Sequence, residues 1–397
     1  MTSDAKRSMQ LSIADRIDSI KQQEWNQIAE QDEYSPFLEY QFLHSVELAG
    51  CAAPNAGWHP NHFVLNGPDG LIGAAPAYVK TNSSGEFIFD HAIAAQVIGA
   101  GLNYYPKLVA TLPFTPCPGY QFLTSDKADI EEQNSCIMEG MREFTYQSKY
   151  GSASILFPSS CFDKRLQEVE NLNSWSHQYF LWLNQDYETF DDYLCSFNKN
   201  QRRNIVRERA SIRNQGITVR IYTGEEIDSY LMSLMFKFYH NTNRNFGLWG
   251  AFFLNEEWFC YIAKVWAHRI VLIAAYMPKY EIPIAMSMLI RKNRHLYGRY
   301  WGDMFYIPNL HFELCYYTPI EYAITQRISD YDPGMGSRHK ARRGFRSYCF
   351  NSYHDYTNKA VREYFSHFAS LCNQEESNLI KQLNDSVPWA RQSVKTT

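Results

Sequence analysis

The chain has 397 residues, more than one hydrophobic core usually serves, so its length predicts two domains. Apolar residues make up 45% of the chain and charged residues 20%, a balance that excludes intrinsic disorder. The net charge of −4 excludes a general polyanion binder whose whole surface is basic.

Neither the ends of the chain nor its cysteines indicate export. The N-terminus is polar, and no apolar run approaches the roughly 18–20 residues that cross a bilayer. Nine cysteines occur without a CxxC pair, a pattern typical of reduced thiols rather than a disulfide frame or a zinc site. HExxH spacing is also missing, so no metal is expected. Together these features predict a cytoplasmic protein without a membrane span.

The first half of the chain predicts helices followed by short strands. Isoleucines at helical spacing predict an amphipathic helix over 11–30, and Pro36 and Gly50 bracket a second one. The elements expected after them are a hairpin of 62–65 and 71–80, a structured loop over 99–122, a helix over 128–149 and a strand over 153–158.

The second half repeats this order after a polar stretch at 159–176. The elements expected there are a strand over 180–183, a long charged helix over 187–215, a strand over 217–222, helices over 225–243 and 255–268, strands over 269–277, 284–291 and 295–301, a helix over 309–328 and a strand over 330–332. The pattern predicts an α+β protein in which each domain, 1–170 and 171–397, has a mixed, mostly antiparallel sheet flanked by helices.

Two stretches concentrate positive charge. Between Lys199 and Arg213 six basic residues accompany the single acid Glu208, and between Arg338 and Arg346 five basic residues follow two glycines and a proline. Guanidinium groups match phosphates and carboxylates in two-point contacts, and a glycine-rich loop brings backbone amides near an anion. An anionic ligand is therefore one interpretation; a solvated helix face and a disordered basic loop are the alternatives.

Two ring-rich stretches are candidate cleft walls. In residues 296–317 a strand ends at Gly302 and a helix begins near Asn309, which puts His311 and Glu313 in its first turn as candidate proton acceptors. Alternatively, Glu313 only complements the helix dipole and His311 is a packed ring. Residues 103–119 combine rings with four prolines in a stiff wall that borders either a ligand or a domain seam.

At these stretches the chain resembles the FemAB-like family of predicted N-acyltransferases, which is associated with peptidoglycan biosynthesis. The matching blocks are GWHPNHF (57–63), GEFIFD (85–90), YYPKLVATLPFTPCPG (104–119), the arginine-rich helix (200–213), LYGRYWG (296–302), LHFELCYYTPIEYAI (310–324) and DPGMGSRHKARRGF (332–345). The resemblance implies tandem GNAT-like domains in which an acyl donor and an acceptor amine meet.

The resemblance also bears on the donor. The pyrophosphate loop of ordinary GNAT enzymes is absent between Trp301 and Leu310, where WGDMFYIPN stands instead. Better-characterised Fem transferases use an aminoacyl-tRNA, and the two basic stretches would suit its phosphates. The expected co-substrate is therefore an acyl-CoA or an aminoacyl-tRNA, with a small-molecule or peptide amine as acceptor and no covalently bound cofactor.

We therefore expect an N-acyltransferase or aminoacyltransferase that forms an amide by direct transfer. The expected catalytic residues are Glu313, His311 and Tyr300. The residues expected to bind substrate are Arg299, Trp301, Gly302, Tyr105, Lys107, Phe114, Arg203, Arg207, Arg338, His339, Lys340 and Arg343. A non-catalytic protein that recognises a cell-wall precursor or another anionic ligand is the main alternative, and a sequence-neutral RNA binder fits the charge less well.

Overall fold

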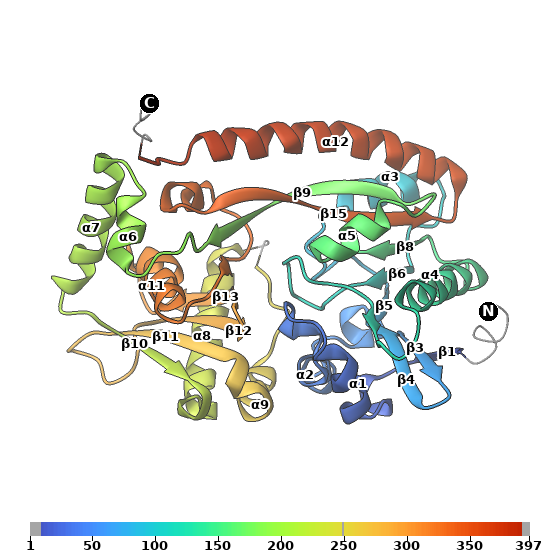
Figure 1. Cartoon of the computed structure of the whole chain (residues 1–397), viewed down its shortest axis with the longest axis horizontal. Coiled ribbons are helices and arrows are strands. Elements are labelled where there is room, and N and C mark those ends of the chain that lie inside the picture. Colours follow the sequence, from blue (N-terminus) through green and yellow to red (C-terminus); the bar gives the residue numbers. More distant parts are fainter. Residues whose placement is uncertain (1–8, 248–249, 391–397) are drawn as a thin grey trace. The chain divides into compact units, whose positions relative to one another are not determined.

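The computed structural model describes residues 9–247 and 250–390, which form two compact units (Figure 1). Unit 1 comprises Met1–His177 and Cys349–Ser377, and unit 2 comprises Gln178–Tyr348 and Asn378–Thr397. The ends of the predicted domains, 1–8 and 391–397, lie outside the described residues. The division differs from the predicted domains because the chain returns to unit 1 after residue 348.

Unit 1 contains two sheets. The first has the strand order β1 (Gln10–Ala14), β3 (His62–Gly67), β4 (Gly70–Ala75) and β7 (Leu123–Thr124), and all of its pairings are antiparallel. The unit 1 strands of the second run in the order β15 (Arg346–Tyr356), β8 (Ser152–Ile155), β6 (Lys107–Ala110), β5 (Ala77–Lys80) and β2 (Trp58–Pro60), with only β6 and β8 parallel.

Helices accompany these sheets. They are α1 (Gln22–Ala29), α2 (Tyr40–Leu48), α3 (His91–Gly99), α4 (Ile130–Gln147), α5 (Ser160–Leu166) and the beginning of α12 (Lys359–Asp385). Asp129 caps the long α4, because its carboxylate accepts a hydrogen bond from the backbone N–H of Glu132, and the helix buries Ile137 and Met141.

The strands of unit 2 form one mixed arrangement. They run in the order β10 (Thr218–Thr223), β11 (Ile270–Tyr276), β12 (Ala285–Lys292), β13 (His295–Asp303), β14 (Asp330–Asp332) and β9 (Asn173–Leu183), which enters from unit 1. Neighbours are antiparallel except β13 and β14, which pair in parallel between 295–297 and 330–332. The parallel pairing ends at Tyr297, and β13 continues from there to Asp303.

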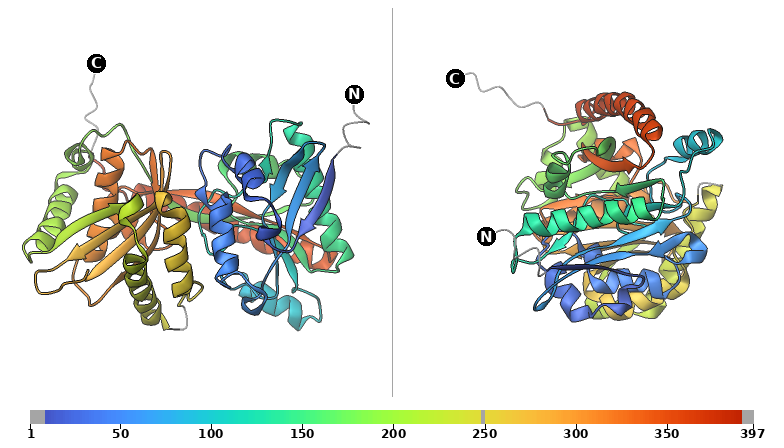
Figure 2. Two further views of the ribbon diagram at one scale, coloured as in Figure 1. Left: turned by 90° about the horizontal axis from the view of Figure 1, so that it is seen from below. Right: turned by 90° about the vertical axis from the view of Figure 1, so that its right-hand side faces the viewer.

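Helices lie on both faces of these strands (Figure 2, left). One face carries α8 (Ser229–Asn245) and α9 (Glu256–Trp266), which pack on β13 through rings such as Tyr239. The other face carries one helical segment made of α10 (Leu310–Phe312), a π-helical turn (Glu313–Tyr317) and α11 (Thr318–Thr325). The short α6 (Phe190–Cys195) and the longer α7 (Lys199–Arg213) pack against this segment.

Several expected elements differ from the structure, and three of them are explained here. The expected helix over 11–30 is β1 followed by a short 3₁₀ turn and α1, because Gln10–Ala14 pairs with β3. The expected helix over 187–215 is interrupted where Asn198 caps α7 with its side chain. The basic stretch contains a 3₁₀ helix, Arg338–Arg343, instead of an irregular loop.

Among the described residues, no helix combines the length and the apolar character that a bilayer crossing requires.

Candidate functional site

The helical segment after β13 is the centre of the candidate site in unit 2. It starts at Asn309, whose backbone is left-handed with φ of 71°, a conformation that asparagine tolerates better than most residues. The Asn309 side chain donates to Ser211 Oγ of α7 at 3.1 Å, so it ties the segment to α7 instead of capping it. The π-helical turn that follows is a geometry that often occurs at functional sites.

Glu313 is held by Arg209 of α7. Arg209 Nε donates to Oε1 at 3.1 Å and to Oε2 at 3.2 Å, and Nη2 donates to Oε1 at 2.9 Å. Thr318 Oγ1 adds a hydrogen bond to Oε1 at 3.1 Å. Two-point guanidinium contacts of this kind fix the position of both groups. The Glu313 carboxylate therefore fastens the π-helical turn to α7.

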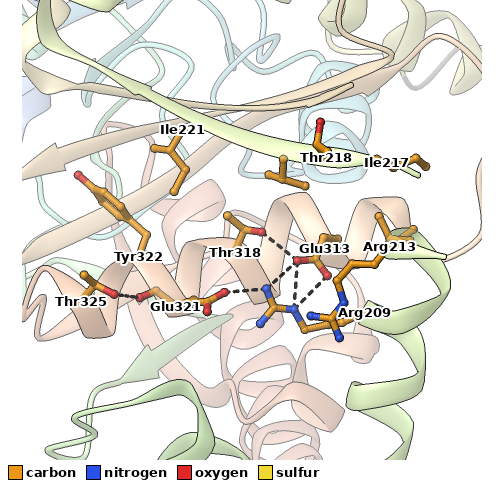
Figure 3. Close-up of a pocket in the computed structure, with 12 residues that line it drawn as sticks. Arg209, Arg213, Ile217, Thr218, Ile221, Glu313, Thr318, Glu321, Tyr322 and Thr325 are labelled. Atoms are coloured by element: carbon orange, nitrogen blue, oxygen red, sulfur yellow. Dashed lines mark hydrogen bonds and ion pairs between the residues drawn. The ribbon is translucent and has the colours of Figure 1, made fainter. Parts of the chain in front are cut away.

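The same arginine reaches a second acid and a cavity. Arg209 Nη2 donates to Glu321 Oε2 at 2.6 Å, and the guanidinium lies 4.5 Å from the centre of the Phe190 ring. We call Arg209, Arg213, Glu313 and Glu321 the arginine cluster. It borders a cavity of about 510 Å³ between α7, β10 and α11, shown in Figure 3. A second cavity of about 430 Å³ shares Arg209, Arg213 and Glu321.

A second ion pair joins α7 to the basic stretch. Arg343 Nη2 donates to Glu208 Oε2 at 2.8 Å, and Arg343 Nε donates to the Tyr317 hydroxyl at 2.9 Å. Tyr317 in turn donates to Glu208. The Arg343 guanidinium also lies 3.5 Å from the centre of the Phe312 ring, a favourable cation–π geometry. The only acid of the basic helix thus compensates a buried arginine of the second basic stretch.

His311 lies among aromatic rings on another side of the segment. Trp301 and Tyr316 meet it edge-on, with ring centres 5.1 and 5.2 Å away. Burial lowers the pKa of His311 to about 4, helped by the positive charges of Lys340 and Arg343. No hydrogen bond to either of its ring nitrogens occurs within 9–247 and 250–390. At neutral pH His311 is therefore a neutral imidazole with an available acceptor nitrogen.

Lys340 is, with Arg343, a buried cation of the second basic stretch. Its ammonium group donates to the carbonyl oxygens of Gly334 at 2.6 Å and Met335 at 2.9 Å. Burial lowers its pKa to about 8, although the Asp332 carboxylate opposes the shift. The neighbouring Arg338 and His339 are exposed, and the His339 ring lies 6.0 Å from that of Phe312. This stretch therefore brings positive charge close to His311.

The expected pairing of His311 with Glu313 in one cleft is not what the structure shows. Residues two positions apart in a helix point about 200° apart around its axis. His311 accordingly faces Trp301 at the end of β13, while Glu313 faces Arg209 of α7. The two side chains occupy different environments, and only Glu313 lines the cavity of Figure 3.

Tyr300 lies on the opposite face of the sheet from His311. Its ring packs against those of Tyr239, Trp258 and Phe259, which belong to α8 and α9. Gly302 also serves packing, because a Cβ there would collide with the backbone of Phe238 in α8. Since side chains alternate along a strand, Trp301 projects to the His311 face and Tyr300 does not.

The three remaining predicted residues of unit 2 lie in two different places. Arg299 Nη1 donates to the carbonyl oxygen of Gly298 at 2.8 Å, and its charge acts on the buried carboxyl of Asp332, whose pKa is raised by burial. Arg203 and Arg207 are exposed on α7. Arg207 donates to Asn204 of the same helix at 3.0 Å. Neither arginine lines the cavity or contacts His311.

The predicted substrate-binding residues of unit 1 lie in its core. Lys107 donates to Glu86 at 2.7 Å and to Asp90 at 2.6 Å, and all three side chains are almost completely buried. Burial lowers the pKa of Lys107, but the two carboxylates outweigh it and raise the pKa overall. We call these three residues together with Lys80 the lysine cluster; Lys80 lies 3.7 Å from the centre of the Trp58 ring.

Rings enclose this cluster. Tyr105 is half-buried and shares a hydrogen bond of 2.7 Å with Ser83. Phe114 is buried, with its ring centre 5.0 Å from that of Trp58. Gly85 has φ of 80°, and a Cβ there would lie 2.7 Å from the Phe114 ring, so glycine is required. The expected aromatic wall is packed core at these positions.

The sequence interpretation missed the residues that organise the unit 2 site. They are Glu208, Arg209, Arg213, Tyr317, Thr318 and Glu321. The sequence did carry a signal for Glu208, because a lone acid in a strongly basic helix is a candidate partner for a buried cation. Arg209 and Arg213 belong to the basic stretch already interpreted as a possible anion site, whereas Tyr317, Thr318 and Glu321 carry no sequence signal beyond helical spacing.

The fold is similar to that of several solved structures. The α+β arrangement with mixed sheets is matched by the crystal structure of FemX, with a TM-score of 0.53, 12% identity, and coverage of 87% of this chain and 98% of that one. The structure of L-PGS from Bacillus licheniformis matches with a TM-score of 0.51, 8% identity, and coverage of 89% and 97%. The predicted α+β fold is confirmed.

The family follows from the sequence match. The chain belongs to the FemAB-like family, described as peptidoglycan biosynthesis/recognition, and the match covers residues 16–391. A tandem GNAT protein from the clavulanic acid biosynthesis pathway is also similar, with a TM-score of 0.41, 8% identity, and coverage of 88% of this chain and 99% of that one. No curated protein matches the chain. The predicted family is confirmed.

Proposed function

We propose that the protein is an N-acyltransferase or aminoacyltransferase in which His311 accepts a proton from the attacking amine. Membership of the FemAB-like family and the fold shared with FemX support the reaction class. The observation that carries the proposal is the neutral His311 ring, whose nitrogens have no hydrogen-bond partner within the described residues.

The chemistry needs one proton acceptor and a positive environment. The amine nitrogen attacks the donor carbonyl, an amide bond forms, and the bond to the donor's sulfur or ester oxygen breaks. The amine proton passes to His311 and then to the leaving thiolate or alkoxide. A weakly basic imidazole suffices, because the nitrogen becomes strongly acidic once it has attacked. Lys340 and Arg343, whose charges act on His311, would stabilise the negative oxygen of the intermediate.

Glu313 has a different role in this proposal. Its oxygens already accept hydrogen bonds from Arg209 and Thr318. We assign Glu313 as a positioning residue, because it fastens the turn that follows His311 to α7. The rings of Trp301 and Tyr316 then hold the imidazole orientation. Tyr300 would contribute indirectly, through packing on α8 and α9.

The donor is an acyl-CoA or an aminoacyl-tRNA. Exposed Arg338 and His339 beside Lys340 offer positive charge that suits the phosphates of either. The acceptor would be a small-molecule or peptide amine. A peptide of the cell wall is the natural first candidate for a family described by peptidoglycan biosynthesis and recognition.

Donor consumption tests this function. The purified full chain is incubated with a panel of acyl-CoAs or aminoacyl-tRNAs and amines, including muropeptides, and products are followed by mass spectrometry. We expect time-dependent amide formation that scales with protein concentration. A chain that binds donor or muropeptide in titration calorimetry but never consumes the donor would instead be the non-catalytic binding protein, and the transferase proposal would be wrong.

A further inference from the structure

The cavity of Figure 3 is a candidate ligand site separate from His311. At about 510 Å³ it falls in the range of small-molecule sites. Its walls come from α7, β10 and the segment of Glu313–Thr325. His311 does not line it. The proposed transfer reaction therefore leaves this cavity without a role.

One wall of the cavity is apolar. Ile212 and Ile217 are buried, and Val219 and Ile221 of β10 are half-buried beside them. Figure 3 shows Ile221 pointing toward the helix that carries Thr318 and Tyr322. A ligand that fills this space would bury hydrocarbon surface against these side chains, which favours binding. An apolar body is therefore the first requirement for the ligand.

The charged groups of the cavity leave one cation unmatched. Arg209 is engaged by Glu313 and Glu321. Arg213, one turn further along α7, is exposed at the rim of the same cavity and has no ion pair or hydrogen bond from its side chain among the described residues. Figure 3 shows both arginines extending from α7 toward the region of Glu313. An available guanidinium beside an apolar wall favours an anionic head group.

The charged residues of the lining also favour a head group with a single negative charge. Glu313 and Glu321 lie in the lining with the two arginines and are both engaged by Arg209, so Arg213 is the one cation left for a head group. A doubly charged phosphate would be repelled by the two carboxylates at short range. A carboxylate brings one charge and two oxygens, which match the two-point geometry of a guanidinium.

We propose that the cavity between α7, β10 and α11 binds a monocarboxylic acid with an apolar body, whose carboxylate pairs with Arg213 and whose hydrocarbon lies on Ile212, Ile217 and Ile221. This site goes beyond the proposed transfer reaction and does not depend on it.

Titration calorimetry with the full chain tests the site. The probes are sodium octanoate, butyrate, octylamine and octyl phosphate, each titrated at pH 7 into the wild type, Arg213→Gln and Arg203→Gln. We expect octanoate to bind at least tenfold more tightly than butyrate and octylamine. Arg213→Gln should weaken octanoate binding by about tenfold or more. The matched control Arg203→Gln, an exposed arginine of the same helix, should leave it unchanged.

Three results would overturn the proposal. Equal affinity of wild type and Arg213→Gln for octanoate would show that the carboxylate does not pair with Arg213. Equal affinity for octanoate and butyrate would show that the hydrocarbon does not lie on the apolar wall. Tighter binding of octyl phosphate would contradict the single charge. Circular dichroism of each variant shows whether α7 is intact, and protection of Arg213 from phenylglyoxal by octanoate gives a readout in the wild type that needs no variant.

Discussion

The lysine cluster of unit 1 and the arginine cluster of unit 2 both pair basic groups with two carboxylates, but they differ in access to solvent. The Lys107, Glu86 and Asp90 side chains are 1–3% exposed. One oxygen of each carboxylate is buried without a hydrogen-bond partner. In the arginine cluster, Arg209 is 15% exposed and Glu321 is 48% exposed, and the cluster borders a cavity.

This difference separates a structural role from a binding role. Charges sealed in a core must be compensated by each other, because neither water nor a ligand reaches them. Charges that line a cavity can exchange partners with a ligand. Burial alone therefore misleads: the lysine cluster contains the most deeply buried charges yet is the poorer candidate for binding.

The largest expected effect comes from breaking the lysine cluster. Lys107→Met leaves the carboxylates of Glu86 and Asp90 buried without the ammonium group that donates to both, and we expect the free energy of unfolding to fall by about 3–5 kcal/mol. Urea denaturation followed by tryptophan fluorescence measures it. Lys164→Met, at an exposed position of α5, is the control and should change stability by less than about 0.5 kcal/mol. A loss as small as the control's would show that the cluster is not structural.

A smaller effect is expected from the arginine cluster. Arg209→Met removes the cation beside buried Glu313, but water in the cavity partly compensates, so we expect a loss of about 2–3 kcal/mol. The double variant Arg209→Met/Glu313→Leu removes both charges and should recover at least half of that loss. Additive losses in the double variant would contradict the assigned ion pair.

Acid should lower the free energy of unfolding through protonation of His311. Its pKa is about 4 in the folded chain against 6.5 for an ordinary histidine, so the unfolded chain binds more protons between these values. Stability from neutral His311 is thus present above pH 6.5 and is lost as the pH falls toward 4. The wild type should lose about 1–3 kcal/mol relative to His311→Gln over this window. The control His91→Gln, at an exposed position, should follow the wild type. If the free energy of unfolding had the same pH dependence in all three proteins, His311 would not be buried and neutral.

The smallest effect concerns the exposed member of the arginine cluster. Glu321→Gln removes an ion pair in which one partner is 48% exposed, and such pairs contribute little. We expect a change in unfolding free energy below about 0.5 kcal/mol, measured as above. A loss close to that of Arg209→Met would show that Glu321, not Glu313, is the main partner of Arg209.

The sequence predicted the family and the α+β fold, and it identified the strand-to-helix junction that carries His311. Patterns of rings, glycines and basic residues are local, so they could be found without coordinates. The partners of those residues could not. Glu208 and Arg343 are far apart along the chain, and only the packing of α7 against the helical segment brings them together.

Side-chain direction was the second limit. The spacing of His311 and Glu313 gave their position in one helical turn but not the neighbour that each faces. Tyr300 and Trp301 show the same limit for a strand, since alternation predicts two faces without naming the side that holds the site. Residues 10–14 formed a strand because β3 offers them a partner, which helical spacing of isoleucines could not reveal.

The rate of a single turnover tests the central proposal most directly. Wild type and His311→Gln are each saturated with the donor found by mass spectrometry, mixed rapidly with the amine, and quenched at intervals. We predict that the variant forms amide about 10²–10⁴-fold more slowly while its affinity for the donor is unchanged. Equal single-turnover rates in the two proteins would contradict the assignment of His311 as the proton acceptor.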